Sequence, residues 1–241
     1  MQIRATIAAI EDGLREQGDA DRAAGEKRYL KSDLDFLGVS VPLIRRQALD
    51  WLRRRRELEV DALRRLVRAL WRRRVHELRS FGVELLVGRV DLLDAEDLEM
   101  VEWMLMRANT WAHVDPLAIQ VGGSLVTRYP ELEGTLNRWL LADELWLRRA
   151  ALLVHLLPLR SGQGDWNRFV RYANQLLDEK DFFIRKAIGW VLREAAKTTP
   201  QRVIDFLSAH PDRISALSLR EAVKPLESGD RERLLAAHRA R

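Results

Sequence analysis

The chain has 241 residues, of which 47% are apolar and 32% charged, with 13 glycines, 7 prolines and no cysteine. The lack of cysteine excludes disulfides, thiolate metal sites and iron–sulfur clusters. Strong helix formers dominate, the first 30 residues lack the apolar run of a signal peptide, and no stretch reaches 18 uncharged apolar residues, so we expect a soluble, cytoplasmic, helical protein.

The net charge of +5 is unevenly distributed along the chain. Residues 45–79 contain 13 arginines against five acidic residues, whereas residues 91–102 contain six acidic residues. A local basic excess favours a surface that faces a polyanion. An arginine-rich, solvated helix face is the alternative that the residues leave open.

Helical periodicity runs through nearly the whole chain, and turn-type clusters divide it into segments of roughly 10–16 residues. The predicted breaks lie at residues 33–42, 91–97, 107–110, 128–134, 158–165, 177–181, 197–200 and 209–212. Asn109–Thr110, Asp143 and Asp181 each precede an apolar helical run, the position typical of an N-cap. We expect about a dozen helices in antiparallel pairs, with a capping helix near residues 225–241.

An ionisable residue recurs at a matching point of successive units, with separations of 36, 34 and 37 positions: Arg79, Asp115, Arg149 and Lys186. Helix pairs that recur at this length are typical of HEAT-like repeats. The sequence therefore predicts an all-α fold, a single domain over residues 1–241 arranged as an α-solenoid with a concave basic groove. A compact helical bundle is the competing architecture.

Asp115 is the single acid at the recurring position, and it follows Trp111 by four residues. This spacing puts the carboxylate and the indole on one helical face. Because Pro116 follows, Asp115 is also compatible with an N-cap before a helix that starts at the proline. The repeat register favours a helix that begins after Thr110, with Asp115 in its second turn.

Several catalytic motifs are absent: the P-loop, the Rossmann glycine pattern, HExxH and GxSxG. The five histidines show no metal-ligand spacing, and we expect His76 and His113 to be a solvated pair. We therefore expect no metal and no cofactor, and hydrolysis by a catalytic triad is disfavoured.

Trp190 occupies a repeat position that is otherwise aliphatic, so it either fills a wider gap or lines a site. We expect Trp111 and Trp190 to face each other across a groove with Asp115 between them. Two indoles and a carboxylate attract a cation, while Arg149 and Lys186 would attract phosphates. An N3- or N7-alkylpurine in DNA has this charge pattern. Because its base leaves without a proton donor, one carboxylate can stabilise the sugar cation and position water.

Five segments, in order, are distinctive: RYLKSDLDFLGVSVPLIRRQ (28–47), LWRRRVHELRSFGVELL (70–86), TWAHVD (110–115), WLRRAALL (146–153) and FFIRKAIGWVLRE (182–194). Together they resemble the AlkD-type DNA glycosylases, the HEAT-like repeat family of DNA alkylation repair proteins. The resemblance implies excision of N3- and N7-alkylated purines without cofactor or metal. It also implies that the lesion duplex lies in the concave groove and that the base is not flipped into a deep pocket.

The resemblance assigns roles to individual residues. It implies that Asp115 stabilises the oxocarbenium ion and orients water, and that Trp111 and Trp190 cradle the deoxyribose and the charged nucleotide. Arg149 matches the family's site arginine. The residues expected to contact the DNA are Tyr29, Arg46, Arg79, Arg148 and Lys186.

The chain departs from the family pattern at four positions. Ala112 and His113 follow Trp111, whereas the better-known members have Trp-Trp-Asp at the start of this motif. Ser40 stands where a glutamine is expected, and Pro116 follows the acid. These departures bear on substrate range and rate more than on DNA binding.

The sequence thus predicts a monomeric, monofunctional glycosylase of the bacterial cytoplasm or nucleoid that acts on double-stranded DNA carrying alkylated bases and leaves an abasic site. No membrane partner is expected. One alternative is a non-catalytic repeat protein for bent or branched DNA, which needs the basic groove but no carboxylate. Another is a protein-interaction scaffold, a common use of such arrays.

Overall fold

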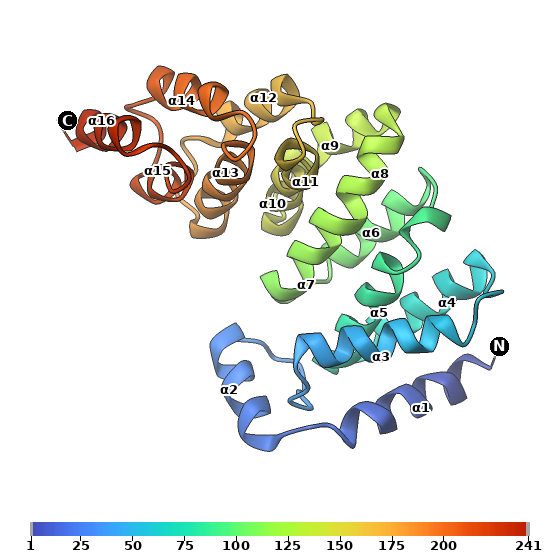
Figure 1. The fold of residues 1–241 in the computed structure, drawn as a ribbon. Coiled ribbons are helices and arrows are strands. Elements are labelled where there is room, and N and C mark those ends of the chain that lie inside the picture. The colour runs from blue at the N-terminus through green and yellow to red at the C-terminus, as the bar shows by residue number, and fades with distance from the viewer. Residues whose placement is uncertain (1, 240–241) are drawn as a thin grey trace. The chain divides into compact units, whose positions relative to one another are not determined.

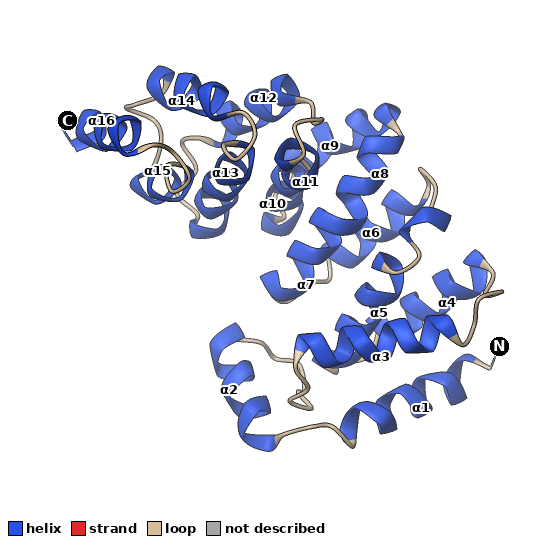
Figure 2. Ribbon diagram, viewed as in Figure 1, coloured by secondary structure: helices blue, strands red, loops and turns tan. Residues whose placement is uncertain are grey.

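The computed structural model describes residues 2–239, which form helices joined by short loops (Figure 1). The chain divides into two compact units, unit 1 (residues 1–117) and unit 2 (residues 118–241). No strand occurs in the described range, and an isolated bridge between Asp35 and Val75 is its only β-type pairing (Figure 2). None of the helices described combines the length and apolarity of a membrane span. The predicted all-α class is confirmed.

Unit 1 is organised around one central helix. Its helices are α1 (Ile3–Arg15), α2 (Ala20–Leu30), α3 (Val41–Arg53), α4 (Val60–Trp71), α5 (His76–Val87), η1 (Val90–Leu92), α6 (Asp97–Leu105) and α7 (Trp111–Pro116). α5 packs against α3, α4 and α7. It is buried along most of its length, and the buried positions include polar side chains at His76, Glu77, Arg79 and Glu84. Buried polar groups need partners, and these side chains supply the contacts that position the site.

Unit 2 repeats the same construction. Its helices are α8 (Gly123–Arg128), η3 (Pro130–Leu132), α9 (Glu133–Leu140), α10 (Leu145–Leu153), α11 (Leu156–Arg160), α12 (Trp166–Leu176), α13 (Phe182–Ala195), α14 (Pro200–Ala209), α15 (Ala216–Ala222) and α16 (Ser228–Arg239). α13 packs against α10, α11 and α15. A Cβ on Gly189 would lie 2.7 Å from the Ser218 carbonyl oxygen, so glycine permits the close approach of α13 to α15. The C-terminal helix α16 covers α14 and α15.

Two of the three predicted N-caps are confirmed. The Thr110 side chain accepts a hydrogen bond at the start of α7, and the Asp181 carboxylate accepts two at the start of α13. The prediction for Asp143 is wrong, because Glu144 is the residue whose side chain caps α10. With this correction, the recurring ionisable residue lies five positions after the cap in each of α7, α10 and α13. The distance from the cap to the recurring residue is therefore the same in all three helices, whereas the sequence predicted one more position in α10.

The position of Asp115 within a helix is also confirmed. α7 begins after Thr110 and includes both Asp115 and Pro116, so Asp115 does not cap a later helix. Pro116 has no backbone N–H to donate. The helix widens directly after it into the π-helix η2 (Leu117–Gly122), a common way to accommodate a lost helical hydrogen bond.

Among the breaks in the helices that went unpredicted, two fall in the basic stretch. They lie at residues 54–59, between α3 and α4, and at residues 72–75, between α4 and α5. Both are rich in arginine and contain neither glycine nor proline. Because arginine and glutamate favour helices, their composition conceals the turns. The basic stretch at residues 45–79 is consequently spread over three helices, α3, α4 and α5, and the two loops that join them.

Candidate functional site

The predicted catalytic acid and two aromatic residues come together in unit 1. Trp111 and Asp115 lie one turn apart on the same face of α7, and Asp115 is only 8% exposed. The Tyr29 ring, from α2, packs edge-on against Trp111, with ring centres 6.0 Å apart and planes at 88°. Tyr29 is 74% exposed and Trp111 is half-buried. These three residues, which we call the Trp111 cluster, place accessible aromatic surface beside a shielded carboxylate.

Arg79 fixes the loop that leads into α7. Its Nε donates to the carbonyl oxygen of Arg73 at 3.0 Å, and its Nη1 donates to the carbonyl oxygen of Arg107 at 3.1 Å. The same Nη1 donates to Asn109 Oδ1 at 2.8 Å, and Asn109 Nδ2 donates to Asp33 Oδ1 at 2.9 Å. Burial lowers the pKa of Arg79. We infer that Arg79 is a positioning residue, and its predicted contact with DNA stays a prediction.

Glu77 fixes the loop between α2 and α3. Its carboxylate is fully buried and accepts hydrogen bonds from the backbone N–H groups of Leu37 (2.9 Å), Gly38 (2.7 Å) and Val39 (3.3 Å). Burial raises the pKa of Glu77, and the three N–H donors oppose that effect. Gly38 has φ +78°, and a Cβ there would lie 1.9 Å from the Asp19 carbonyl oxygen, so only glycine fits. Glu77 thereby holds the helix that carries Tyr29 in place.

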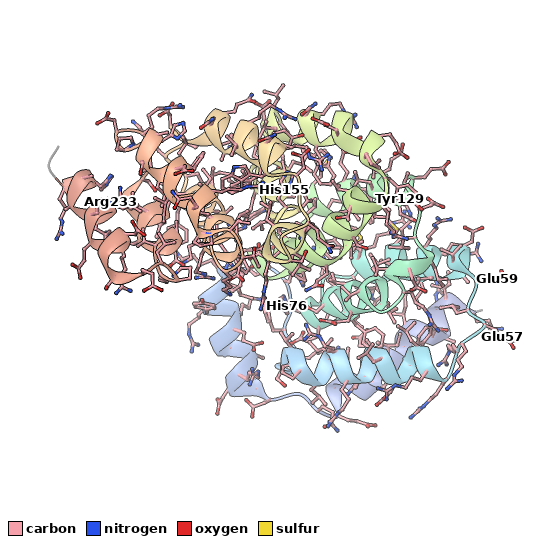
Figure 3. All side chains as sticks on the ribbon, turned by 45° about the horizontal axis from the view of Figure 1, so that its top comes forward. Glu57, Glu59, His76, Tyr129, His155 and Arg233 are labelled. Carbon is pink, nitrogen blue, oxygen red and sulfur yellow. The ribbon has the colours of Figure 1, made fainter. Side chains whose placement is uncertain are left out.

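His76 and His113 are buried, and the prediction of a solvated pair is wrong. Their ring centres lie 4.4 Å apart, the Phe36 ring stacks on His76 at 4.5 Å, and Trp71 packs edge-on against His113 at 5.3 Å. Figure 3 labels His76 among the side chains of unit 1. Burial lowers the pKa of His76 to about 4 and holds the pKa of His113 well below its ordinary value. Both rings are therefore neutral at pH 7.

These neutral histidines predict a loss of stability in acid. An unfolded histidine takes up a proton near pH 6.5, whereas folded His76 stays neutral down to about pH 4. The folded state therefore loses about 1.4 kcal/mol per pH unit for such a group as the pH falls through this window. The His76→Phe variant keeps an aromatic ring on Phe36 but has no imidazole to protonate at this position. As the pH falls, its free energy of unfolding should therefore decrease by about 1.4 kcal/mol per pH unit less than that of the wild-type protein. Urea titrations between pH 6.5 and 4.5 measure the slopes, and equal slopes would refute the prediction.

Three of the four departures from the family pattern occupy structural positions. His113 is a buried residue of α7, Pro116 precedes η2, and Ser40 is the N-cap residue of α3, without a capping bond from its side chain. Ala112 is half-buried. The His113 side chain thus serves packing within unit 1.

In unit 2, Arg149 and Trp190 occupy neighbouring helices. Arg149, on α10, is only 3% exposed, and its Nη1 donates to the carbonyl oxygen of Phe183. Its guanidinium carbon lies 5.6 Å from the centre of the Phe183 ring. Trp190, on α13, is half-buried. The Arg149 side chain is thus held in place by α13, the helix that carries Trp190.

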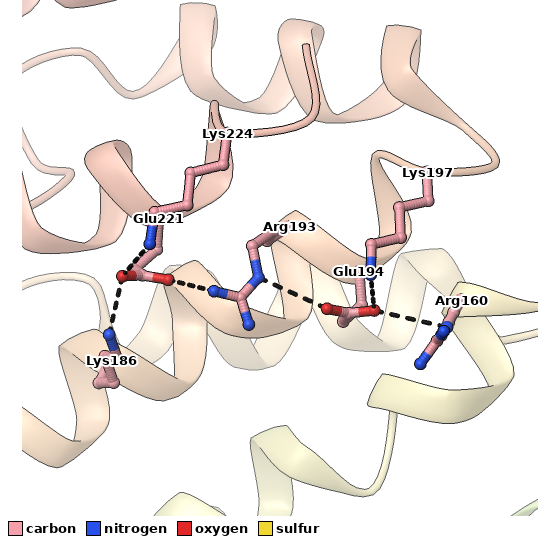
Figure 4. A network of polar contacts seen from close by, with 7 residues as sticks. All are labelled: Arg160, Lys186, Arg193, Glu194, Lys197, Glu221 and Lys224. Carbon is pink, nitrogen blue, oxygen red and sulfur yellow. Dashed lines mark hydrogen bonds and ion pairs between the residues drawn. The ribbon is translucent and has the colours of Figure 1, made fainter.

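Lys186 belongs to a cluster of charges along α13 (Figure 4). Its Nζ lies 2.7 Å from Glu221 Oε1, and Glu221 also pairs with Arg193 and Lys224. Burial opposes ionisation of Glu221, but hydrogen bonds from Lys186 and Lys224 lower its pKa to about 2. The Lys186 side chain remains 36% exposed. Its ammonium group is therefore held in one place yet accessible to an anion.

The remaining predicted DNA contacts differ in exposure. Arg46, on α3, is exposed. Arg148 is 18% exposed, and its Nη1 donates to the carbonyl oxygens of Ala142 (2.7 Å) and Asp143 (2.8 Å), which secures the turn between α9 and α10. Within residues 2–239, no three histidine, aspartate or glutamate side chains gather as a metal site would require.

A family model identifies the family of the chain, and solved structures show a similar fold. The family model for DNA alkylation repair enzymes matches residues 10–226. A predicted DNA alkylation repair enzyme from Enterococcus faecalis has a similar structure, with a TM-score of 0.78 and 24% identity over 88% of this chain and 98% of that one. AlkD2 from Streptococcus mutans gives a TM-score of 0.61 and 16% identity over 98% and 97% of the two chains. No curated protein matches the sequence significantly. The structural similarities show a shared helical-repeat fold.

Proposed function

Because the chain belongs to the DNA alkylation repair enzyme family, we propose that it is a monofunctional DNA glycosylase for cationic N3- and N7-alkylpurines in duplex DNA. The supporting observation is the Trp111 cluster, in which a largely buried Asp115 shares a helical face with Trp111, packed against the exposed Tyr29. Aromatic faces and a carboxylate both attract positive charge. Such a surface suits a nucleotide whose base is a cation.

The proposed reaction needs one acidic residue. The bond between C1′ of the sugar and the purine nitrogen breaks, and its electron pair stays with the base, which neutralises the positive charge of the alkylpurine. The base therefore leaves without a proton donor, and the sugar becomes an oxocarbenium ion. The Asp115 carboxylate stabilises this ion, and the stabilisation is strong because burial lowers the local dielectric. Water then forms a bond to C1′ and gives a proton to Asp115, which leaves an abasic site.

The family resemblance supplies the other proposed roles. Within unit 1, Trp111 and Tyr29 contact the lesion nucleotide. Within unit 2, Trp190 offers an indole and Arg149 a fixed positive charge to the DNA. The proposed backbone contacts include the exposed Arg46 and the partly exposed Lys186, for which a DNA phosphate would compete with Glu221. Arg79 and Arg148 act chiefly through the backbone carbonyls that they hold.

Base release from a methylated duplex tests the proposal. The protein is incubated with duplex DNA containing 7-methylguanine, and the free base and the abasic sites are both counted. We expect equal numbers of the two and no strand cleavage. Tight, salt-dependent binding without base release would instead indicate a non-catalytic DNA-binding protein. A protein without affinity for DNA at moderate salt would indicate an interaction scaffold.

A further inference from the structure

Three arginine side chains surround one tryptophan in unit 1. Trp103 lies on α6, Arg68 and Arg72 come from α4 and its C-terminal end, and Arg107 follows α6. Their guanidinium carbons lie 5.5, 5.7 and 5.0 Å from the centre of the Trp103 ring. We call these four residues the Trp103 cluster. They lie on different helices from the Trp111 cluster.

The positive charges of the Trp103 cluster lack acidic partners. Within the described part of the chain, no carboxylate pairs with Arg68 or Arg72, and Arg107 donates only to the carbonyl oxygen of Trp103. One turn earlier on α4, Arg64 pairs with three carboxylates at 2.7–2.9 Å. Along this row of arginines, the charge of Arg64 is therefore neutralised by carboxylates, whereas the charges of Arg68 and Arg72 are not.

Three like charges around one ring repel one another, and the cation–π contacts offset part of that cost while they hold the guanidinium groups in place. An anion bound among them would remove the repulsion. Guanidinium groups match phosphate oxygens in pairs. Because the arginines lie over the indole, its ring is covered against stacked bases and against an apolar anchor from a protein partner. The cluster therefore favours a phosphate backbone.

We propose that the Trp103 cluster binds the phosphodiester backbone of duplex DNA, independently of sequence and of damage. The choice of DNA as the polyanion rests on the proposed function. The structure also connects the two clusters, because Arg79 binds the carbonyl oxygens of Arg73 and Arg107 as well as Asn109, next to α7. Duplex held at the Trp103 cluster would thus be gripped by the same loops that position the Trp111 cluster.

The test measures affinity for an undamaged duplex by fluorescence anisotropy over a range of salt concentrations. Each phosphate contact contributes about one unit to the slope of log affinity against log salt. In the Arg68→Gln/Arg72→Gln variant, the slope should fall by about two units and the affinity at moderate salt roughly tenfold or more. The single-turnover rate of base release at saturating protein should stay unchanged.

A matched control removes the same charge from the same unit. In Arg15→Gln/Arg53→Gln, both arginines are exposed and already paired with acidic neighbours, so binding should change little. As a direct readout, the indole N–H resonance of Trp103, assigned by its absence in Trp103→Phe, should shift when undamaged duplex is added to the wild-type protein.

The two proposals fail in distinguishable ways. Affinity and slope equal to those of the control variant, or an indole resonance that does not move, would overturn the Trp103 site even if base release proceeds normally. A wild-type protein that does not bind duplex would overturn it as well. Binding and a Trp103 shift without base release would support the Trp103 site and overturn the glycosylase assignment alone.

Discussion

Replacing Asp115 with asparagine is expected to slow the release of 7-methylguanine by about 100-fold or more. Asparagine keeps the shape of the side chain but removes its negative charge, so it loses the attraction to positive charge that develops on the sugar. The loss should appear in the single-turnover rate at saturating protein, because the charge acts in the transition state. The affinity for the same lesion duplex should stay within about twofold, since other residues hold the backbone.

The matched control is Asp50→Asn, which removes one negative charge from the same unit. Asp50 lies on α3, where its 41% exposed side chain pairs with Arg53. Its substitution should leave the rate of base release unchanged. Equal rates for Asp115→Asn and the wild-type protein would contradict the catalytic role of the acid. Equal losses in both variants would reveal a general effect of net charge.

Replacing Glu77 with alanine is expected to lower the free energy of unfolding by about 3 kcal/mol or more, because the backbone N–H groups of Leu37, Gly38 and Val39 lose their acceptor inside the protein. The loop that follows α2 would loosen, so the contact between Tyr29 and Trp111 should weaken as well. Urea unfolding measures the stability.

Glu84→Ala is the control for Glu77, since it removes a second buried carboxylate from the same helix. Glu84 pairs with Arg45, whose side chain is 57% exposed and can return to water. Its loss should therefore cost only about 1 kcal/mol. Similar losses of stability in the two variants would show that the three backbone donors do not depend on Glu77.

The repeat register was the part of the site that the sequence could predict. The separations between Arg79, Asp115, Arg149 and Lys186 place each on a second helix, and the structure confirms that Asp115 lies inside α7 despite Pro116. Periodicity and spacing report which face a residue occupies on its own helix. They carry this information regardless of what packs against that face.

The partners of these side chains could not be predicted in the same way. Asn109 contacts Asp33, which is 76 positions away, and no local pattern encodes that contact. His76 and His113 were expected to be solvated. Their burial depends on ring contacts that local spacing does not reveal, including the stacking of His76 on Phe36, which lies in the loop before α3. The Trp103 cluster depends on arginine side chains of α4 and its C-terminal end that reach Trp103 on α6, whereas the sequence shows only a basic stretch.

The most direct measurement compares single-turnover release of 7-methylguanine, a cation, with release of hypoxanthine, a neutral base, from duplexes of the same sequence. A site with one carboxylate and no proton donor can cleave the bond only when the base already carries the positive charge. We expect release of 7-methylguanine well above the spontaneous rate and no enzymatic release of hypoxanthine. Excision of both bases at similar rates, or of neither, would contradict a reaction driven by Asp115 acting on a cationic lesion.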